Sequence, residues 1–270
     1  MAPVTEFEEL EKAGWERTVD DYYAACRPVT HRLIAPLLDA ARVSAGSRVL
    51  DVGTGPGDVA AEAAARGAEV IGLDFAKAMV TLAVRLHPGL SFVIADAVAP
   101  PFEDRSFDAV VGNFTLHHIP DQQRALVSWR HLLRDGGCLA LTVWDDPSAC
   151  RMLGLFVDAV AAAGISPTDE HAAAPAMAAG DETYRALLHA AGFHPTSVTT
   201  IGFTIHPVSV DALWTSVLAA TVRTASTITR ESLTVQQQIR AAFDRLTTDY
   251  LTEDGLVVPV SVKLIAGRAA

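Results

Sequence analysis

Three glycines beside an acid form the strongest chemical signal in the chain, in the stretch VLDVGTGPGDVA. The acid is Asp51, the glycines are Gly53, Gly55 and Gly57, and Asp58 follows at once. A strand that turns directly into a helix needs positive φ angles, and a ligand lying on that turn needs backbone without Cβ atoms. A dinucleotide-binding loop would read GxGxxG and hold pyrophosphate at the helix N-terminus. Here the spacing is GxGxG and two acids repel phosphate, so the turn favours a cationic ligand; the alternative is a tight turn that binds nothing.

Two more acids end neighbouring apolar runs of the sequence. Asp74 closes the run EVIGLD, and Asp96 closes the run SFVIAD. At the end of the second strand of a nucleotide-binding sheet, a carboxylate binds ribose hydroxyls, whether the ribose belongs to a dinucleotide or to another adenosyl compound. Asp74 alone therefore does not distinguish these ligands. The alternative for both acids is a solvated strand end.

Short apolar runs alternate with helical patterns from Arg48 onward, and these elements must position the acids. The expected strands are residues 48–53, 69–74, 91–96, 107–114 and 138–144. The expected helices are residues 58–66, 76–86 and 121–133, and RDGG forms a turn before the fifth strand. This βαβ alternation predicts a parallel sheet with helices on both faces. Parallel sheets bind ligands at the carboxyl ends of their strands, so we expect the three acids at one edge.

Helical segments flank this predicted core. Residues 1–44 are expected to form an N-terminal helical cap of two helices, 7–27 and 28–43. Beyond the fifth strand we expect a helix over 149–163, an Ala/Pro-rich surface loop over 166–181, a helix over 184–191, a sixth strand over 197–208, helices over 210–226 and 230–250, and a last strand over 258–268. The fold class is therefore α/β, with a doubly wound (Rossmann-like), mostly parallel seven-stranded sheet. Its core is residues 45–209 plus 251–270, and residues 210–250 form a helical lid inserted between the last two strands.

Five motifs in this order make the chain similar to the class I S-adenosylmethionine-dependent methyltransferases. They are the acid-GxGxG run, Asp74, Asp96-Ala97 followed by FDAVV, the segment NFTLHHIPD, and LLRDGGCLALTVW. The segment NFTLHHIPD resembles the one that follows the fourth strand in ubiquinone and menaquinone biosynthesis methyltransferases and their small-molecule relatives. The resemblance covers residues 45–145, and the motifs are highly specific together although each is weak alone.

The resemblance implies S-adenosylmethionine as the cofactor and S-adenosylhomocysteine as the product. The residues that it assigns to the methionine portion are Asp51, Gly53, Thr54, Gly55, Gly57 and Asn113. The residues that it assigns to the ribose and adenine are Asp74, Phe75, Met79, Asp96 and Ala97. Tyr22, Tyr23 and Thr30 precede the first strand, where relatives often close the site over the cofactor. For Met79 the alternative is a place in the core of its helix.

Candidate catalytic and acceptor residues lie outside the cofactor motifs. One of His117 and His118 could deprotonate an acceptor, since imidazole titrates near neutral pH; the alternative is a structural loop. Trp144, Phe156, Phe203 and Trp214 could line an apolar acceptor pocket, although aromatic residues at such spacings are also typical of a core. No nucleophile motif such as GxSxG occurs, and methyl transfer from a sulfonium needs none, because the donor carries the activation.

Composition excludes several classes of partner. Of the 270 residues, 50% are hydrophobic, and 21 basic against 32 acidic residues give a net charge of −11. A field of that sign repels phosphate backbones and anionic lipid surfaces, so neither nucleic acid nor membrane is expected as a partner. The acidic N-terminus lacks the pattern of a secretory signal, which favours the cytoplasm. Acids outside the motifs, such as Glu8, Glu9, Glu11, Asp20 and Asp21, are expected to be solvated surface.

Neither a disulfide framework nor a metal is expected. The cysteines Cys26, Cys138 and Cys150 are odd in number and far apart, with no CxxC pair. Asp145 and Asp146 do follow the fifth strand, where one methyltransferase branch binds Mg²⁺. The fourth strand, however, ends in Asn113 and not in an acid, and hard cations need several oxygen ligands together.

These observations predict an S-adenosylmethionine-dependent methyltransferase that acts by in-line displacement on a small-molecule acceptor. The acceptor atom is carbon or oxygen, less so nitrogen, of a fairly apolar molecule from secondary-metabolite or quinone-like biosynthesis. We expect a monomer or homodimer. Two alternatives stay open: a methyltransferase-like protein that binds the cofactor without methyl transfer, such as a cyclase, and a nicotinamide-dependent oxidoreductase. The second would be expected to carry GxGxxG and a Tyr/Lys or His/Asp set, which the sequence lacks.

Overall fold

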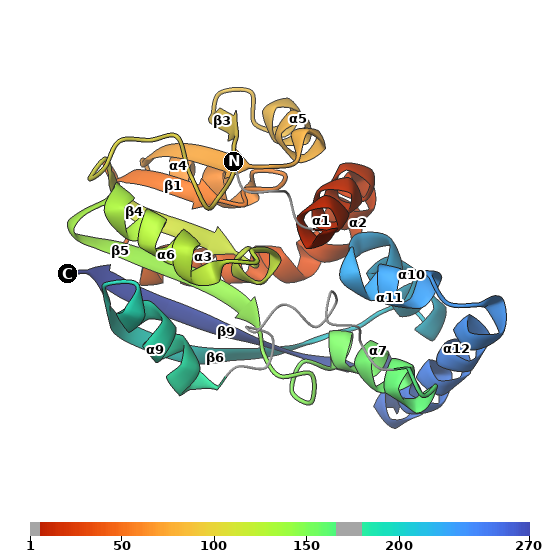
Figure 1. Ribbon diagram of the computed structural model, residues 1–270. Coiled ribbons are helices and arrows are strands. Elements are labelled where there is room, and N and C mark those ends of the chain that lie inside the picture. Colours follow the sequence, from red (N-terminus) through yellow and green to blue (C-terminus); the bar gives the residue numbers. More distant parts are fainter. Residues whose placement is uncertain (1–5, 166–179) are drawn as a thin grey trace.

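A seven-stranded sheet organises the chain in the computed structural model, which describes residues 6–165 and 180–270 (Figure 1). Its order is β3-β2-β1-β4-β5-β9-β6. The strands are β1 (Arg48–Val52), β2 (Glu69–Asp74), β3 (Ser91–Ile94), β4 (Phe107–Asn113), β5 (Leu133–Trp144), β6 (Phe193–Ile205) and β9 (Val258–Ala269). The first five run parallel, whereas β9 pairs antiparallel with β5 and β6. The predicted doubly wound, mostly parallel seven-stranded sheet is confirmed.

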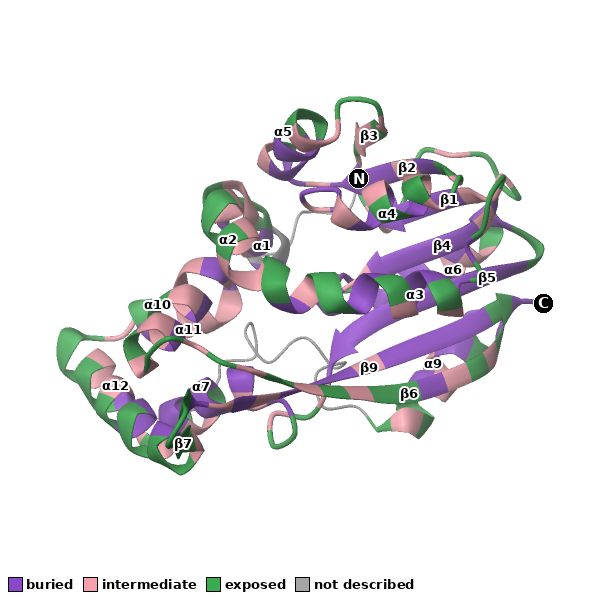
Figure 2. Cartoon of the chain, turned by 180° about the vertical axis from the view of Figure 1, so that it is seen from behind, coloured by how far each residue is buried: buried purple, intermediate pink, exposed green. Residues whose placement is uncertain are grey.

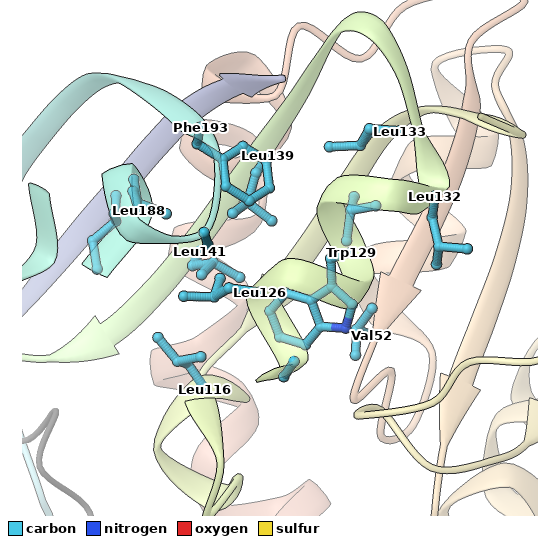
Figure 3. Packing of buried hydrophobic residues seen from close by; sticks show 14 of the residues in the cluster. Val52, Leu116, Leu126, Trp129, Leu132, Leu133, Leu139, Leu141, Leu188 and Phe193 are labelled. Carbon is cyan, nitrogen blue, oxygen red and sulfur yellow. The ribbon is translucent and has the colours of Figure 1, made fainter. Parts of the chain in front are cut away.

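The central strands are buried on both faces, which explains their near-continuous apolar runs (Figure 2). Alternate residues divide between two cores: Leu50 joins one cluster, whereas its neighbour Val49 joins the other. The first cluster lies under α6 (Gln122–Leu132) and α9 (Asp181–Ala190), with Trp129 fully buried at its centre (Figure 3). The second lies under α3 (Ile34–Ala40) and α4 (Asp58–Ala65). Two layers of helices therefore fix the strand ends that carry the acids.

The fifth strand begins earlier than the sequence indicates. Its pairing with β4 shifts between Phe107↔Leu133 and Ala109↔Cys138, so RDGG lies in an irregular section at the start of β5. Gly136 has a φ of +74° there, which a glycine accepts without strain. The RDGG segment still reverses the chain after α6, as the sequence predicts, but it does so inside the strand assignment.

The N-terminal region contains three α-helices, so the prediction of two helices over 7–27 and 28–43 is wrong. They are α1 (Glu6–Arg17), α2 (Val19–Thr30) and α3, with a 3₁₀ turn η1 (His31–Leu33) before α3. The first break falls at Thr18, where the backbone leaves helical geometry with φ −95° and ψ 7°. Pro28 lies inside the last turn of α2, where it does not end the helix.

The inserted segment also contains one helix more than expected. Between β6 and β9 lie α10 (Val210–Ala220), α11 (Arg223–Thr229), α12 (Leu233–Thr247), the 3₁₀ turn η3 (Thr248–Tyr250) and a small hairpin of β7 (Leu251–Thr252) and β8 (Gly255–Leu256). The expected helix over 210–226 is broken because Thr221 is extended, with φ −119° and ψ 142°. Ser232 caps α12, so that helix starts after residue 230.

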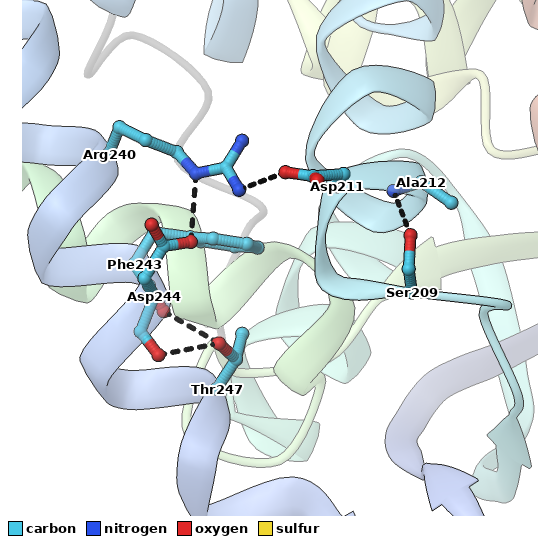
Figure 4. Close-up of polar contacts among 7 residues, drawn as sticks. All are labelled: Ser209, Asp211, Ala212, Arg240, Phe243, Asp244 and Thr247. Carbon is cyan, nitrogen blue, oxygen red and sulfur yellow. Dashed lines mark hydrogen bonds and ion pairs between the residues drawn. The ribbon is translucent and has the colours of Figure 1, made fainter.

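A third apolar cluster joins this insertion to the sheet. It comprises buried side chains of α7 (Arg151–Ala162), α10 and α12 together with the ends of β6 and β9. Polar contacts reinforce it: Arg240 of α12 pairs with Asp244 and reaches Asp211 of α10, and the Ser209 hydroxyl accepts from the Ala212 amide at the start of α10 (Figure 4). The insertion is therefore a packed part of the fold.

Two short helical segments follow strands of the sheet. The chain also contains α5 (Lys77–Leu86) and the 3₁₀ turn η2 (Leu116–His118), which follow β2 and β4. The expected surface loop over 166–181 lies almost entirely outside the described residues. Within residues 6–165 and 180–270, no helix has both the length and the apolar character needed to span a bilayer.

Close packing at the start of α7 leads to a first prediction. A Cβ added at Gly154 would lie 1.8 Å from the carbonyl oxygen of Pro147, a backbone atom that cannot rotate away. We expect Gly154→Ala to lower the free energy of unfolding by about 1–3 kcal/mol, as overpacking of a core does. Gly202→Ala on β6 is the control, because its added Cβ meets no atom within 4 Å. Equal unfolding midpoints for both variants in denaturant titrations would contradict this packing.

Candidate functional site

One large cavity of about 1370 Å³ lies at the carboxyl ends of β1, β2 and β4. This is the point where the strand order reverses, since β2 lies on one side of β1 and β4 on the other. The wall changes character along its length. Gly53, Gly55, Asp74 and Asp96 line one end, and apolar side chains of α7 and α10 line the other. Such a cavity accommodates a polar and an apolar ligand side by side.

The turn after β1 is shaped by positive φ angles and by one close approach. Gly53, Gly55 and Gly57 have φ values of +66°, +53° and +88°. A Cβ at Gly53 would lie 2.4 Å from the hydroxyl of Thr115, which itself donates to the Val52 carbonyl at 2.8 Å. A Cβ at Gly55 would meet nothing within 4 Å, so this glycine faces open space. The turn thus presents bare backbone to the cavity.

Two buried carboxylates lie at the ends of adjacent strands. Asp51 accepts a hydrogen bond from the Thr54 hydroxyl at 2.6 Å, and burial together with the nearby charge of Asp74 raises the pKa of Asp51 to about 7. Asp74 accepts from the amides of Gly55 and Ala76, both at 2.9 Å. Burial also raises the pKa of Asp74, although those amide donors oppose the shift. Two carboxylates that burial discourages from ionising favour a cationic partner.

The adenosine-side residues predicted from the sequence line the same cavity: Phe75, Met79, Asp96 and Ala97. Asp96 accepts from the Val98 amide at 2.8 Å, which holds the loop after β3 in a tight turn. The carbonyl of Ala97 accepts from the indole of Trp129 at 2.8 Å. Met79 is buried in α5 as well as lining the wall, so the core alternative and the cavity position hold together.

Backbone strain follows β4. Asn113 donates to the Thr30 carbonyl at 3.1 Å and accepts from the Thr142 hydroxyl at 2.6 Å, so its amide is fixed at the cavity wall. Phe114 has a φ of +59°, which a bulky residue rarely adopts. Its ring stacks on Trp144 with 4.1 Å between ring centroids, and both rings line the cavity. The strained residue therefore supplies a flat aromatic wall.

Both histidines of NFTLHHIPD line the cavity, in different surroundings. His117 is buried, and burial together with His118 and Arg223 holds its pKa well below the usual value. Nδ1 of His118 lies 2.9 Å from Oε2 of Glu11 on α1. At neutral pH, then, His117 is an uncharged imidazole and His118 carries a carboxylate partner.

Glu11 corrects the expectation of a solvated acid. Its side chain is only 2% exposed, and it accepts from the Trp15 indole at 2.8 Å and lies 3.2 Å from Nε of Arg223 on α11. Burial would raise the pKa of Glu11, but His118, Arg223 and Trp15 together outweigh burial and hold the pKa below its usual value. Helical spacing in the sequence gave no signal for this role, because two of the partners, His118 and Arg223, lie more than 100 residues away.

The acceptor-side aromatic residues divide into two pairs. Trp144 and Phe156 line the cavity, whereas Phe203 and Trp214 do not. Trp214 packs between Phe156 and Phe243 beneath Arg240, and the guanidinium of Arg32 covers Phe203. The sequence missed the aliphatic wall, which consists of Met152, Leu153, Val160, Leu213 and Val217.

The remaining predicted residues lie around the glycine turn. Thr30 and Tyr22 line the large cavity, while Tyr23 and Thr54 line a small adjoining one of about 30 Å³. Asp51 lines neither cavity, and Gly57 faces His87 and Phe92 instead. No group of three or more His, Cys, Asp or Glu side chains suited to a metal occurs in the described ranges. Asp145 accepts from the Ser261 hydroxyl at 2.7 Å.

Comparison with known proteins agrees with this geometry. Residues 50–141 match the family model described as a methyltransferase domain. A demethylmenaquinone methyltransferase of Clavibacter sepedonicus is 33% identical over 180 residues, which is 62% of this chain and 71% of that protein. The solved phosphoethanolamine N-methyltransferase 2 of Haemonchus contortus superposes with a TM-score of 0.61 at 18% identity, covering 98% of this chain and 60% of that one.

The extent of these matches varies. A demethylmenaquinone methyltransferase of Renibacterium salmoninarum is 34% identical over 119 residues, or 44% of this chain. The match spans 50% of the length of this relative. The matched family segment contains the glycine turn, the acids at the ends of β1 and β2, and both histidines. The chain belongs to the class I S-adenosylmethionine-dependent methyltransferases of the ubiquinone and menaquinone type.

Proposed function

We propose that the chain transfers a methyl group from S-adenosylmethionine to a carbon or oxygen atom of a small, fairly apolar acceptor. The observation that carries the proposal is the single cavity that joins the acid-lined glycine turn to an aliphatic and aromatic wall. A cationic adenosyl compound suits the first end and an apolar acceptor suits the second. The names of the relatives, demethylmenaquinone methyltransferases, support a quinol-like acceptor in a biosynthetic pathway.

The residues fit the cofactor part by part. The open space at Gly55 would accommodate the methionine portion, and the buried Asp51, which accepts from Thr54 of the turn, would be the counter-charge for its ammonium group. The Asp74 carboxylate is held by two amides and keeps lone pairs for ribose hydroxyls. Phe75 and Met79 lie where an adenine ring would pack, and Asp96 with Ala97 closes the far wall.

When bound, the sulfonium cofactor supplies an activated methyl group for in-line displacement. The protein then positions the acceptor and excludes water. The stacked pair Phe114 and Trp144 would hold a flat ring, and Leu213 and Val217 would enclose its apolar side. Neutral His117 adds no charge near the reacting atoms.

We further propose that the chain divides into a helical cap at residues 1–44, a core at 45–209 plus 251–270, and a lid at 210–250. Residues of α10 and α11 line the cavity, which supports a lid role for these two helices. No residue of α12 lines it, and α12 instead packs on α7, which supports a structural role. Acceptor specificity would then depend on α10 and α11.

The test of the activity measures both ligands. Calorimetry should show binding of S-adenosylmethionine and S-adenosylhomocysteine but not of NADH, because the turn lacks the GxGxxG spacing. Incubation of naphthols and quinols with methyl-labelled cofactor should then give a labelled product. Binding of NADH alone would contradict the proposal, and cofactor binding with no labelled product would favour a non-transferring relative.

Asp51 gives the cofactor affinity a pH dependence. Its pKa near 7 means that the carboxylate of the free protein ionises as the pH rises from 6.0 to 7.5. The cofactor ammonium prefers the ionised form, so affinity should rise about eight-fold over this range, following the ionised fraction. In Asp51→Asn the affinity should be weaker and flat with pH. A wild-type affinity that falls as the pH rises would contradict this role, as judged by calorimetry in matched buffers.

A larger side chain at the apolar end of the cavity should weaken acceptor binding without weakening cofactor binding. Val217 is buried in α10 and lines the cavity, so Val217→Trp should raise the acceptor KM by about ten-fold or more, the size of effect expected for pocket changes of this kind. Cofactor affinity should stay within about two-fold, since the glycine turn is untouched. Val208→Trp, at a position 95% exposed, is the control. If Val217→Trp weakened cofactor binding but left the acceptor KM unchanged, the acceptor would not bind at this end of the cavity.

A further inference from the structure

The buried carboxylate of Glu11 contacts the imidazole of His118 and the guanidinium of Arg223, so three segments far apart in the sequence meet at this point. Glu11 lies on α1, His118 ends η2, and Arg223 begins α11. We propose that His118 removes a proton from the acceptor and that Glu11 is the positioning residue that enables it. The acceptor is then a weakly acidic hydroxyl compound, a phenol or an enol. This inference rests on the proposed methyl transfer and specifies its acceptor class.

The hydrogen bond decides which ring nitrogen of His118 is free. Glu11 Oε2 lies 2.9 Å from Nδ1. An ionised carboxylate can only accept, so neutral His118 carries its proton on Nδ1 and has a lone pair on Nε2. His118 is a cavity-lining residue with a side chain 20% exposed, so it is open to a ligand, unlike the buried carboxylate beneath it. A carboxylate behind the ring also stabilises the imidazolium that proton transfer produces.

Neighbouring groups keep Glu11 charged and in place. Arg223 lies 3.2 Å from Oε1, and the Trp15 indole donates to Oε2 at 2.8 Å. Trp15 also packs edge-on against the His118 ring, with 5.0 Å between centroids. Carboxylate and ring are therefore each held from two sides. The charged or titratable groups that face His118 are Glu11, its neighbour His117 and Asp74, with Arg223 acting through Glu11.

His117 does not fit this role. Its side chain is buried, its Nδ1 has no hydrogen-bond partner, and burial disfavours the charged ring. A base must become an imidazolium at the moment of proton transfer, which needs a counter-charge at hand. Among the two histidines, only His118 has a carboxylate within hydrogen-bond distance.

The step balances without a further reactant. The acceptor O–H bond breaks, its proton moves to Nε2 of His118, and its electron pair forms the new bond to the methyl carbon. The pair of the broken sulfur–carbon bond stays on sulfur, which becomes neutral. In an enol the same proton loss directs the new bond to carbon or to oxygen. The proton on His118 is later lost to solvent, which resets the Glu11–His118 pair.

The experiment compares Glu11→Gln with Glu253→Gln, a control at an exposed acid between β7 and β8 that does not line the cavity. Two acceptors are used, a naphthol and a nitro-substituted naphthol that ionises at lower pH without help. With the naphthol, Glu11→Gln should lower kcat by about 10- to 100-fold, as loss of a supporting partner does. With the ionised nitro compound the loss should be within about two-fold, because no base is needed.

A second readout needs no turnover. In nitrogen-15 NMR of the folded protein, wild type and Glu253→Gln should show a low-field Nδ1 proton on His118, assigned with His118→Gln. Glu11→Gln should lack that signal. Equal losses of kcat with both naphthols, or an Nδ1 signal unchanged in Glu11→Gln, would overturn the inference while leaving methyl transfer intact. If the wild type gave no labelled product with both naphthols, the proposed function itself would be contradicted, whatever the NMR shows.

Discussion

The close approach of the chain after β1 to the chain after β4 is the constraint on which the rest of the site depends. The Thr115 hydroxyl donates to the Val52 carbonyl, and only a glycine at position 53 leaves room for the Thr115 side chain. This contact is made where the strand order reverses, so it fixes the floor of the crevice. Residues 116–118 and the glycine turn therefore take their positions from the same contact.

Helix α1 is held over that crevice by two carboxylates. Glu16 accepts from the amides of Lys77 and Ala78 at the start of α5, at 2.7 and 3.0 Å, and so caps that helix from outside. Glu11 joins His118 and Arg223 at the other side. One helix thus links the adenosine side of the cavity to the inserted helices. A buried charge is costly unless it is paired, and Glu11 offsets that cost with three partners.

The sheet and the cofactor side of the site could be predicted from the sequence because their signals are local. Turn glycines follow a strand directly, and Asp74 and Asp96 are recognisable from the runs that they end. The rest of the cavity could be predicted only in part in this way, since His117, His118, Trp144 and Phe156 do line it but other residues of its wall gave no local signal. Glu11 has the sequence surroundings of a solvated acid, and its burial depends on contacts with segments more than 100 and 200 residues further along the chain. Likewise, nothing local separates Trp144, which lines the cavity, from Trp214, which packs behind it.

The acidic residues behind the net charge of −11 divide into exposed side chains and a few buried ones. Many of the acidic side chains are exposed. Asp51, Asp74 and Glu11 are buried, and Asp74 and Glu11 line the cavity. The first two lie within the family segment over 50–141, whereas Glu11 and Arg223 come from flanking helices outside it. The residues that we propose for cofactor recognition therefore lie in the segment shared with the family, apart from those before the first strand. The support that we propose for His118 comes from outside that segment, so a protein could keep the shared cofactor residues and still differ in its acceptor.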